Sequence, residues 1–150
     1  MNEILFLLIL GHLFGDYLLQ SYCLAVNKKK YSLIGWSSAT YHCLIYTTTI
    51  YGFLLIEGIK LNFIQCLLIF LSHFIIDKFP VIEYYMKVMD IRSWDRELPK
   101  TGNGVDFENK EPITIIQLVT TSFGSFVYIM CDNTFHLFFM YLILKFSIGV

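Results

Sequence analysis

Three polar side chains interrupt a long apolar run near the start of the chain, in the stretch Gly11-His12-Leu13-Phe14-Gly15-Asp16-Tyr17-Leu18-Leu19-Gln20. Residues four apart share one face of a helix, so His12, Asp16 and Gln20 would form one polar stripe. A carboxylate exposed to hydrocarbon costs roughly 2.5 to 3.5 kcal/mol on insertion scales. Asp16 is therefore expected to face protein, water or a metal ion, which makes it a functional candidate.

The composition of the 150-residue chain is that of a membrane protein. Hydrophobic residues make up 56% of it, charged residues make up 15%, and the mean hydropathy is +0.60. The charges crowd into two short segments, whereas a soluble domain needs polar groups over most of its surface. The net charge of -1 provides no basic surface for a nucleic-acid partner. We expect one domain, residues 1–150, embedded in the lipid bilayer.

The apolar runs predict an all-α integral membrane protein, a bundle of four to five transmembrane helices. Five is the preferred number, and four is the alternative because the last run is short for a hydrocarbon core about 30 Å thick. Pro80 cannot donate a helical hydrogen bond and should end the third span. Gly11 and Gly15 form a small-xxx-small pair that would let another helix approach closely. The expected spans are residues 4–24, 39–56, 61–79, 113–131 and 135–150.

Residues 80–112 form the main polar segment and are expected to be a loop. Its first part, residues 81–89, mixes aromatic, apolar and charged side chains, as in a helix that lies on a membrane surface. The remainder has turn chemistry and could act as a lid or a docking loop. Nine of the eleven basic residues lie in or beside this loop and the loop at 24–38. Both loops are therefore expected to be cytoplasmic, with the N-terminus outside.

Three of the four histidines have an aspartate four residues away, in the pairs His12/Asp16, His73/Asp77 and Asp132/His136. Such pairs can bring two ligands to a metal ion, or let a carboxylate fix an imidazole tautomer. The alternative is that each pair is a buried hydrogen bond that holds helices together. Imidazole and carboxylate ligands without thiolate suit Zn²⁺, Mn²⁺ or another divalent ion.

The predicted topology gathers polar groups from three spans in one layer on the cytoplasmic side. His42 is expected to act there as a base or substrate contact, with an ordinary buried histidine as the alternative. The four cysteines are dispersed singly, which favours small apolar side chains over disulfides or zinc thiolates. The expected metal ligands are His12, Asp16, His73 and Asp77, and the further candidates are Gln20, Tyr46, Ser72, Asp132 and His136.

Several motifs in the first half of the chain recur together in one known family. They are His12-Leu13-Phe14-Gly15-Asp16-Tyr17-Leu18-Leu19-Gln20, Asn27-Lys28, His42 and Ser72-His73-Phe74-Ile75-Ile76-Asp77-Lys78. This pattern, over about residues 4–80, resembles the uncharacterised bacterial and phage membrane family called domain of unknown function 3307. A more distant similarity, to inner-membrane proteins described as metal-dependent hydrolases, implies hydrolysis only by analogy.

The resemblance also implies a later motif of Asp-Gln, two residues and His. Residues 132–136 are similar to it, with Asn133 in the place of Gln. In the five-span arrangement an extra apolar run precedes this motif. The motif would then lie at the outer face of the membrane, away from the other His/Asp pairs.

Together these observations predict a protein of the bacterial inner membrane with a His/Asp centre, occupied by Zn²⁺ or Mn²⁺, in the cytoplasmic half of the bundle. Such a centre could hydrolyse a phosphoester or an ester of an amphipathic substrate. The alternative is a small non-enzymatic, phage-derived membrane protein that oligomerises or binds another membrane protein through the polar loop. A proton- or ion-coupled carrier is the third interpretation, although the inverted repeats expected of a carrier are not visible.

Overall fold

The computed structural model describes residues 2–89, 101–102, 105–106 and 115–148. Two compact units divide the chain: the first is Met1–Pro80 with Thr134–Val150, and the second is Val81–Asn133. Much of the loop expected at 80–112 lies outside the described residues, so its lid or docking role stays a prediction.

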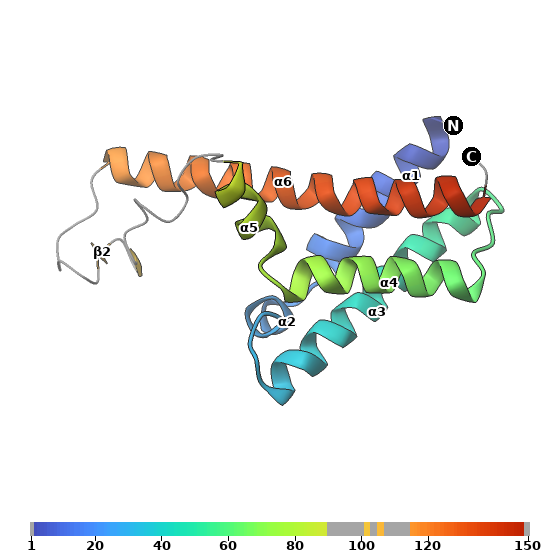
Figure 1. Ribbon diagram of the computed structural model, residues 1–150, viewed down its shortest axis with the longest axis horizontal. Coiled ribbons are helices and arrows are strands. Elements are labelled where there is room, and N and C mark those ends of the chain that lie inside the picture. Colours follow the sequence, from blue (N-terminus) through green and yellow to red (C-terminus); the bar gives the residue numbers. More distant parts are fainter. Residues whose placement is uncertain (1, 90–100, 103–104, 107–114, 149–150) are drawn as a thin grey trace. The chain divides into compact units, whose positions relative to one another are not determined.

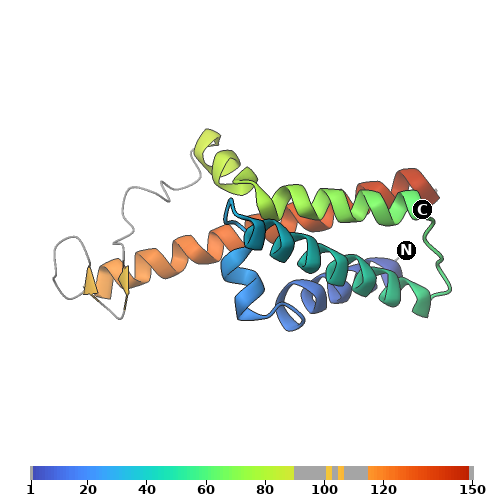
Figure 2. The same ribbon diagram turned by 90° about the horizontal axis from the view of Figure 1, so that it is seen from below.

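The first unit is built from helices. Its elements are α1 (Asn2–Leu13), the π-helical turn η1 (Phe14–Leu18), α2 (Tyr22–Asn27), α3 (Leu33–Ile56), α4 (Phe63–Lys78) and the C-terminal part of α6 (Ile115–Ile148). Figures 1 and 2 show α3 and α4 side by side, with a short connection joining them, and α1 against α3.

The first apolar run does not form the single helix expected over residues 4–24. After α1 the amide of Leu19 donates to the carbonyl of Phe14, five residues earlier, at 2.9 Å, which widens the turn. Ser21 is then extended, and its hydroxyl accepts a hydrogen bond from the amide of Leu24 at 3.4 Å, so α2 begins separately. The 12 residues of α1 reach only about 18 Å, short of a bilayer.

α3 and α4 each begin at a residue whose side chain caps the helix, and they end at or next to the residues expected from the sequence. Ser32 caps α3 by accepting from the amide of Gly35 at 3.2 Å, which starts this helix at Leu33 rather than near residue 39. Asn62 and Gln65 form a capping box that starts α4. The expected end of this helix at Pro80 is confirmed, because α4 stops at Lys78.

The C-terminal half contains one helix where two spans were expected. α6 runs through Asp132, Asn133 and Thr134 without a break and has 34 residues. The polar triplet led to the prediction of a turn there. However, residues 125–148 contain neither proline nor glycine, and Asp, Asn and Thr each cost a helix interior only up to about 0.7 kcal/mol relative to alanine. The expected break in the helix between residues 131 and 135 is therefore wrong.

Two helices among the described residues are long and apolar enough to cross a membrane, α3 and the Ser122–Phe146 part of α6. α4 and α5 (Val81–Val88) would together provide a third candidate span only if the two helices form one broken span. The chain is thus largely helical with two to three candidate spans, and the predicted four to five are not confirmed.

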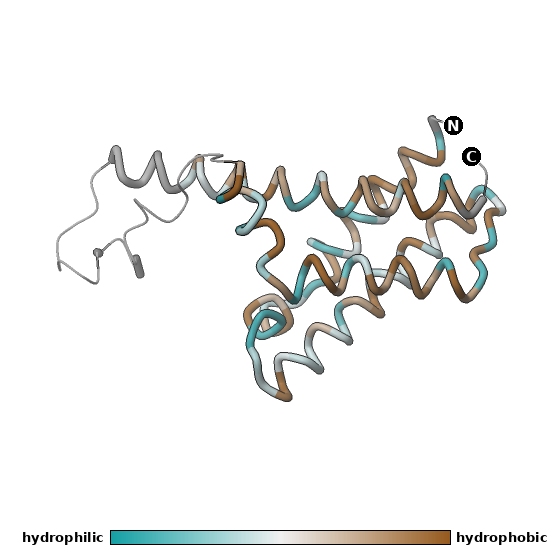
Figure 3. The backbone as a smooth tube through the Cα atoms, in the orientation of Figure 1, coloured by the Kyte–Doolittle hydropathy of each residue, from teal (hydrophilic) through white to brown (hydrophobic). Residues whose placement is uncertain are grey.

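Large apolar side chains are exposed on the first unit, for example Leu44 and Leu55 on α3 and Leu68 and Leu71 on α4. Figure 3 shows the apolar stretches along α4. Soluble proteins rarely expose apolar surface on this scale, which indicates association with a membrane.

The core of the first unit forms where α1, α3, α4 and α6 meet, around Leu8, Tyr46, Ile50, Ile69 and Met140. The close approach expected at Gly11 and Gly15 is confirmed. A Cβ on Gly11 would lie 3.0 Å from Ile50 Cδ1, and one on Gly15 would lie 2.9 Å from Tyr46 Cδ2. The absence of side chains at both glycines therefore lets α3 pack directly against α1 and η1.

The second unit contains α5, the first part of α6 and a two-stranded antiparallel ladder. The ladder consists of β1 (Thr101–Gly102) and β2 (Val105–Asp106). The hydroxyl of Tyr128 on α6 donates to Glu83 Oε1 on α5 at 3.2 Å. A helix was expected over residues 81–89 and α5 is present there, but its position on a membrane surface stays a prediction.

Candidate metal centre

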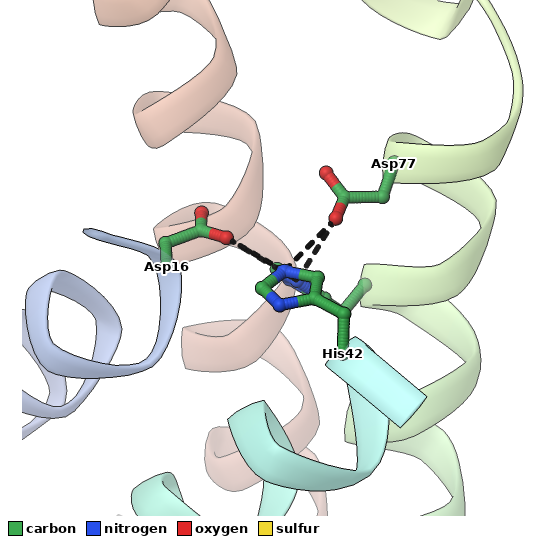
Figure 4. Close-up of side chains that lie close together, drawn as sticks. Asp16, His42 and Asp77 are labelled. Carbon is green, nitrogen blue, oxygen red and sulfur yellow. Dashed lines mark hydrogen bonds and ion pairs between the residues drawn. The ribbon is translucent and has the colours of Figure 1, made fainter. Parts of the chain in front are cut away.

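Four buried side chains from three elements converge inside the first unit. Asp16 comes from η1, His42 from α3, and His73 and Asp77 from α4. One nitrogen or oxygen atom of each lies within 4.8 Å of the corresponding atoms of the other three. Figure 4 shows Asp16 and Asp77 on either side of His42, with both carboxylates directed at its ring. We call these four residues the four-residue centre.

Five of the six distances between the ligand atoms of this centre fall in a narrow range, and all six are within 4.8 Å. His42 Nε2 lies 3.0 Å from Asp16 Oδ1, 3.1 Å from Asp77 Oδ2 and 3.1 Å from His73 Nε2. His73 Nε2 lies 3.5 Å from Asp16 Oδ1 and 3.3 Å from Asp77 Oδ2. Zinc bonds of 2.0–2.2 Å at tetrahedral angles would separate neighbouring ligand atoms by about 3.3 to 3.6 Å. The donor set therefore fits a divalent ion with little rearrangement.

Hydrogen bonding alone accounts for these distances less well than a bound metal ion does. A neutral imidazole nitrogen carries at most one hydrogen, yet Nε2 of His42 faces two carboxylate oxygens and the Nε2 atom of His73. A single N–H can serve only one of those neighbours well. Of the two buried carboxylates, Asp77 is paired with the Lys28 ammonium, whereas Asp16 faces histidine nitrogens, and a buried carboxylate without a cation is costly. A cation between the ligand atoms would be attracted by all of them.

A second layer of residues surrounds the four-residue centre. His12 Nδ1 lies 3.8 Å from Asp16 Oδ2 and 3.0 Å from the Tyr46 hydroxyl. His136 Nδ1 lies 3.0 Å from Nδ1 of His73, and its Nε2 lies 3.7 Å from Asp77 Oδ1. Both outer histidines therefore approach the carboxylate oxygen that the centre does not use.

The ring of Tyr46 fixes one face of the centre. It stacks on His73 with the ring centroids 3.6 Å apart and the planes at 11°. Tyr46 also belongs to the apolar core, so it couples the orientation of a ligand imidazole to the packing of the helices.

One lysine contacts the centre directly, and a second lysine contacts the backbone that carries the first. Lys28 Nζ donates to Asp77 Oδ2 at 2.7 Å. The buried Lys78 donates to the carbonyls of Lys28 and Lys30 at 3.0 and 2.7 Å, and its ammonium lies 4.5 Å from the ring centroid of Trp36. Neither lysine is among the site residues that the sequence predicts. The signal that could have identified them is their position in the motifs Asn27-Lys28 and Asp77-Lys78.

Gln20 also reaches this region. With its amide oriented to satisfy its hydrogen bonds, the amide oxygen accepts from Lys28 Nζ at 2.9 Å and from His42 Nε2 at 3.2 Å. Its nitrogen donates to the carbonyl of Asp16 at 3.3 Å. The polar stripe expected from the first sequence motif therefore faces the interior of the unit.

The structure exchanges the positions expected for two histidines, because His12 was predicted to be a metal ligand and His42 to be a base or substrate contact. His42 lies within the four-residue centre, and His12 lies beside it in the second layer. Ser72 donates to the carbonyl of Ile69 in its own helix at 3.0 Å. Asp132 lies on α6 in the second unit.

The expected separation of His136 from the other His/Asp pairs is wrong, whereas its position at the outer face of the membrane stays a prediction. Because α6 does not break after residue 131, His136 is carried into the first unit and meets His73. The four cysteines are free, as expected, although Cys23 is exposed rather than buried.

Comparisons with known proteins agree with the motif pattern. No curated protein and no solved structure matches the chain significantly, so the distant similarity to metal-dependent hydrolases is not shown. One family model matches residues 4–150, which extends the resemblance from the first motifs to the end of α6. The chain therefore belongs to the family described as "Protein of unknown function (DUF3307)".

Proposed function

We propose that the four-residue centre binds one divalent metal ion, with Zn²⁺ preferred, in a membrane-associated protein. The observation that supports this most strongly is the range of 3.0–3.5 Å in the five ligand-atom pairs that include His42 or His73, close to the edge of a tetrahedral zinc shell. Mn²⁺, the other ion considered, favours octahedral shells richer in oxygen.

Metal analysis of the purified protein tests this proposal. The parent protein in mild detergent should carry about one zinc per chain. Asp16→Asn and Asp77→Asn should lose it, because an amide keeps the shape of the side chain but not the anionic ligand. Glu57→Gln makes the same chemical change at an exposed helix end and should keep the zinc. A parent protein that binds no metal after reconstitution would refute the centre.

We further propose that the bound ion supports hydrolysis of a phosphoester or an ester of an amphipathic substrate. The ion would supply Lewis acidity that polarises a phosphoryl or acyl oxygen, which requires its shell of four protein ligands to expand and admit that oxygen as a fifth ligand. In this assignment Asp16, His42, His73 and Asp77 hold the ion, so His42 acts as a ligand rather than as a base. His12 and His136 orient the two carboxylates from the second layer. The bilayer would supply the substrate.

A structural role for the metal is the second candidate function. Four protein ligands fill a tetrahedral shell, and closed shells are typical of structural zinc sites, whereas catalytic sites keep an open position. Here the ligands come from η1, α3 and α4, so an ion would hold three segments together. This role suits the non-enzymatic alternative, a small membrane protein that oligomerises or binds another membrane protein.

Activity and stability separate the two roles. Zinc-loaded protein is assayed with a chromogenic phosphomonoester that carries an alkyl chain, and its thermal unfolding is measured with and without a chelator. Catalysis predicts turnover that chelation and Asp77→Asn abolish and that Glu57→Gln leaves intact. Zinc binding that stabilises the protein without turnover of phosphoesters or carboxylic esters would favour the structural role.

A further inference from the structure

The four-residue centre is more open on one side than on the other. The side chains of Asp16, His42, His73 and Asp77 are at most 6% exposed, whereas the side chain of Lys28 is 14% exposed. Gln20 is half-buried beside it. Tyr46 and His12, in contrast, are buried on their side of the centre. Lys28 and Gln20 therefore form the side of the centre that is nearest to solvent.

The backbone that carries Lys28 is held firmly in place. Lys78, directly after the ligand Asp77, donates to the carbonyls of Lys28 and Lys30. A Cβ on Gly35 would lie 1.9 Å from the carbonyl oxygen of Lys30, so this approach requires a glycine. The same short segment of α4 thus supplies a ligand of the centre and fixes the loop whose lysine contacts that ligand.

The hydrogen bonds of the Lys28 ammonium leave room for a ligand. An ammonium group has three hydrogens. Asp77 Oδ2 and the Gln20 amide oxygen accept two of them within the part of the chain that the structure describes. The third hydrogen can therefore be donated to an oxygen that approaches from the more exposed side.

The charges around the centre balance differently with and without a metal ion. Asp16 and Asp77 supply two negative charges, and Lys28, in contact with Asp77, supplies one positive charge. With neutral histidines these charges sum to −1, and a divalent ion would change the sum to +1. Uncompensated charge is costly in a buried site. An anionic ligand would offset this positive charge.

We propose that Lys28 binds the phosphate group of a phosphomonoester, which is placed between the Lys28 ammonium and the metal ion. A phosphomonoester carries a charge of about −1.5 to −2 near pH 7, and lysine is a common phosphate ligand. This inference rests on the proposed metal centre and names the substrate class for it. Metal and phosphate should therefore bind cooperatively, because each neutralises charge that opposes the binding of the other.

Zinc affinity measured with and without inorganic phosphate tests this inference, with free zinc buffered by a chelating indicator. Phosphate should tighten zinc binding to the parent protein by about tenfold or more, within the usual range of coupling between sites. In the absence of phosphate, Lys28→Met should bind zinc more tightly than the parent does, because a competing positive charge is removed. Phosphate should no longer tighten the binding of zinc to this variant. That gain in zinc affinity would also show that the variant is folded.

Two further variants make the test specific. Lys28→Arg keeps the charge and should keep most of the coupling. Lys60→Met removes an exposed lysine in the α3–α4 connection and should behave like the parent. Zinc binding without any effect of phosphate, or full coupling in Lys28→Met, would overturn the phosphate site and leave the metal centre standing. Failure of the parent to bind zinc under either condition would overturn both.

The source of the phosphate is tested in nanodiscs. Tighter zinc binding in discs with phosphatidic acid than in discs of phosphatidylcholine alone would indicate a lipid phosphomonoester. Coupling to inorganic phosphate without an effect of phosphatidic acid would indicate a soluble phosphate compound. Both results support the proposed site, and the absence of coupling in both experiments would refute it.

Discussion

His73 uses both ring nitrogens and one ring face within the polar cluster. Its Nε2 points to His42 and Asp77, its Nδ1 meets Nδ1 of His136 at 3.0 Å, and Tyr46 stacks on its ring. If Nε2 binds a metal ion, Nδ1 carries the hydrogen and donates it to His136. Such a partner fixes the tautomer and the orientation of a ligand imidazole.

Replacement of His136 should therefore weaken metal binding without changing its stoichiometry. We expect His136→Ala to lower zinc affinity by about 10- to 100-fold, the usual cost of losing a hydrogen-bond partner of a metal ligand. His136→Asn offers an amide oxygen as a substitute acceptor and should recover part of the loss. Titration with a chelating indicator measures both affinities.

The control for this experiment is Ser72→Ala, which removes a hydroxyl that bonds within its own helix. This variant should bind zinc like the parent. Parental affinity in His136→Ala would contradict the positioning role of His136. Complete loss of zinc at saturating concentrations would instead make His136 a direct ligand.

At the scale of the helices, the contact of α3 with η1 controls the centre. A Cβ on Gly15 would lie 2.9 Å from the ring of Tyr46 and 3.3 Å from its Cα, so both the ring and the backbone oppose it. Gly15→Ala should destabilise the protein by about 1 to 3 kcal/mol, as overpacking usually does. It should also weaken zinc binding, because Tyr46 stacks on His73.

Gly52→Ala is a matched control in the same region of the fold. No atom lies within 4 Å of a Cβ at Gly52, which is inside α3. Alanine should stabilise the helix there by up to about 1 kcal/mol, because glycine has the lower helix propensity. Thermal unfolding in detergent compares the two variants. Equal stabilities of Gly15→Ala and Gly52→Ala would show that the close approach at Gly15 is unimportant.

At the scale of the whole molecule, the feature of the topology that can be tested directly is whether α3 crosses the membrane. Its 24 residues reach about 36 Å, enough to cross a hydrocarbon core of about 30 Å. Tyr31 precedes this helix, and Lys60 follows it in the connection to α4. Both residues are exposed. If α3 crosses the membrane, these two positions lie on opposite sides.

We predict that Tyr31 is cytoplasmic and Lys60 is external, because the loop before α3 is basic. In a Cys23→Ser background, which removes the exposed native thiol, an impermeant thiol reagent applied to intact cells should label Lys60→Cys. It should label Tyr31→Cys only after the membrane is opened. Labelling of Tyr31→Cys but not Lys60→Cys in intact cells would reverse the orientation, and labelling of both would mean that α3 does not cross.

Zinc should also stabilise the fold as a whole, since its ligands come from three separate segments. At a free zinc concentration of 100 times the dissociation constant, the stabilisation should be about 2.7 kcal/mol. For a chain of this size that is a shift of several degrees in Tm. Chelation should remove the shift in the parent and have no effect in Asp77→Asn. An identical response of the two proteins would show that the ion acts elsewhere.

The sequence by itself determined the features that depend on local spacing and composition. The i,i+4 pairs His12/Asp16 and His73/Asp77, the end of α4 before Pro80 and the small residues Gly11 and Gly15 all follow from the helical repeat and from steric limits on single residues. Apolar composition indicated a membrane protein, and the cost of burying a carboxylate indicated that Asp16 and Asp77 would face a common interior.

Only the tertiary structure decided which side chains from different helices meet. Distances between helices depend on packing at specific contacts, such as Gly15 against Tyr46, and no spacing within one helix encodes them. Packing placed His42 in the four-residue centre and His12 outside it, and the uninterrupted α6 brought His136 to His73. Lys28 and Lys78 gained their positions in the same way, because the compensation of a buried charge depends on neighbours that only the folded chain supplies.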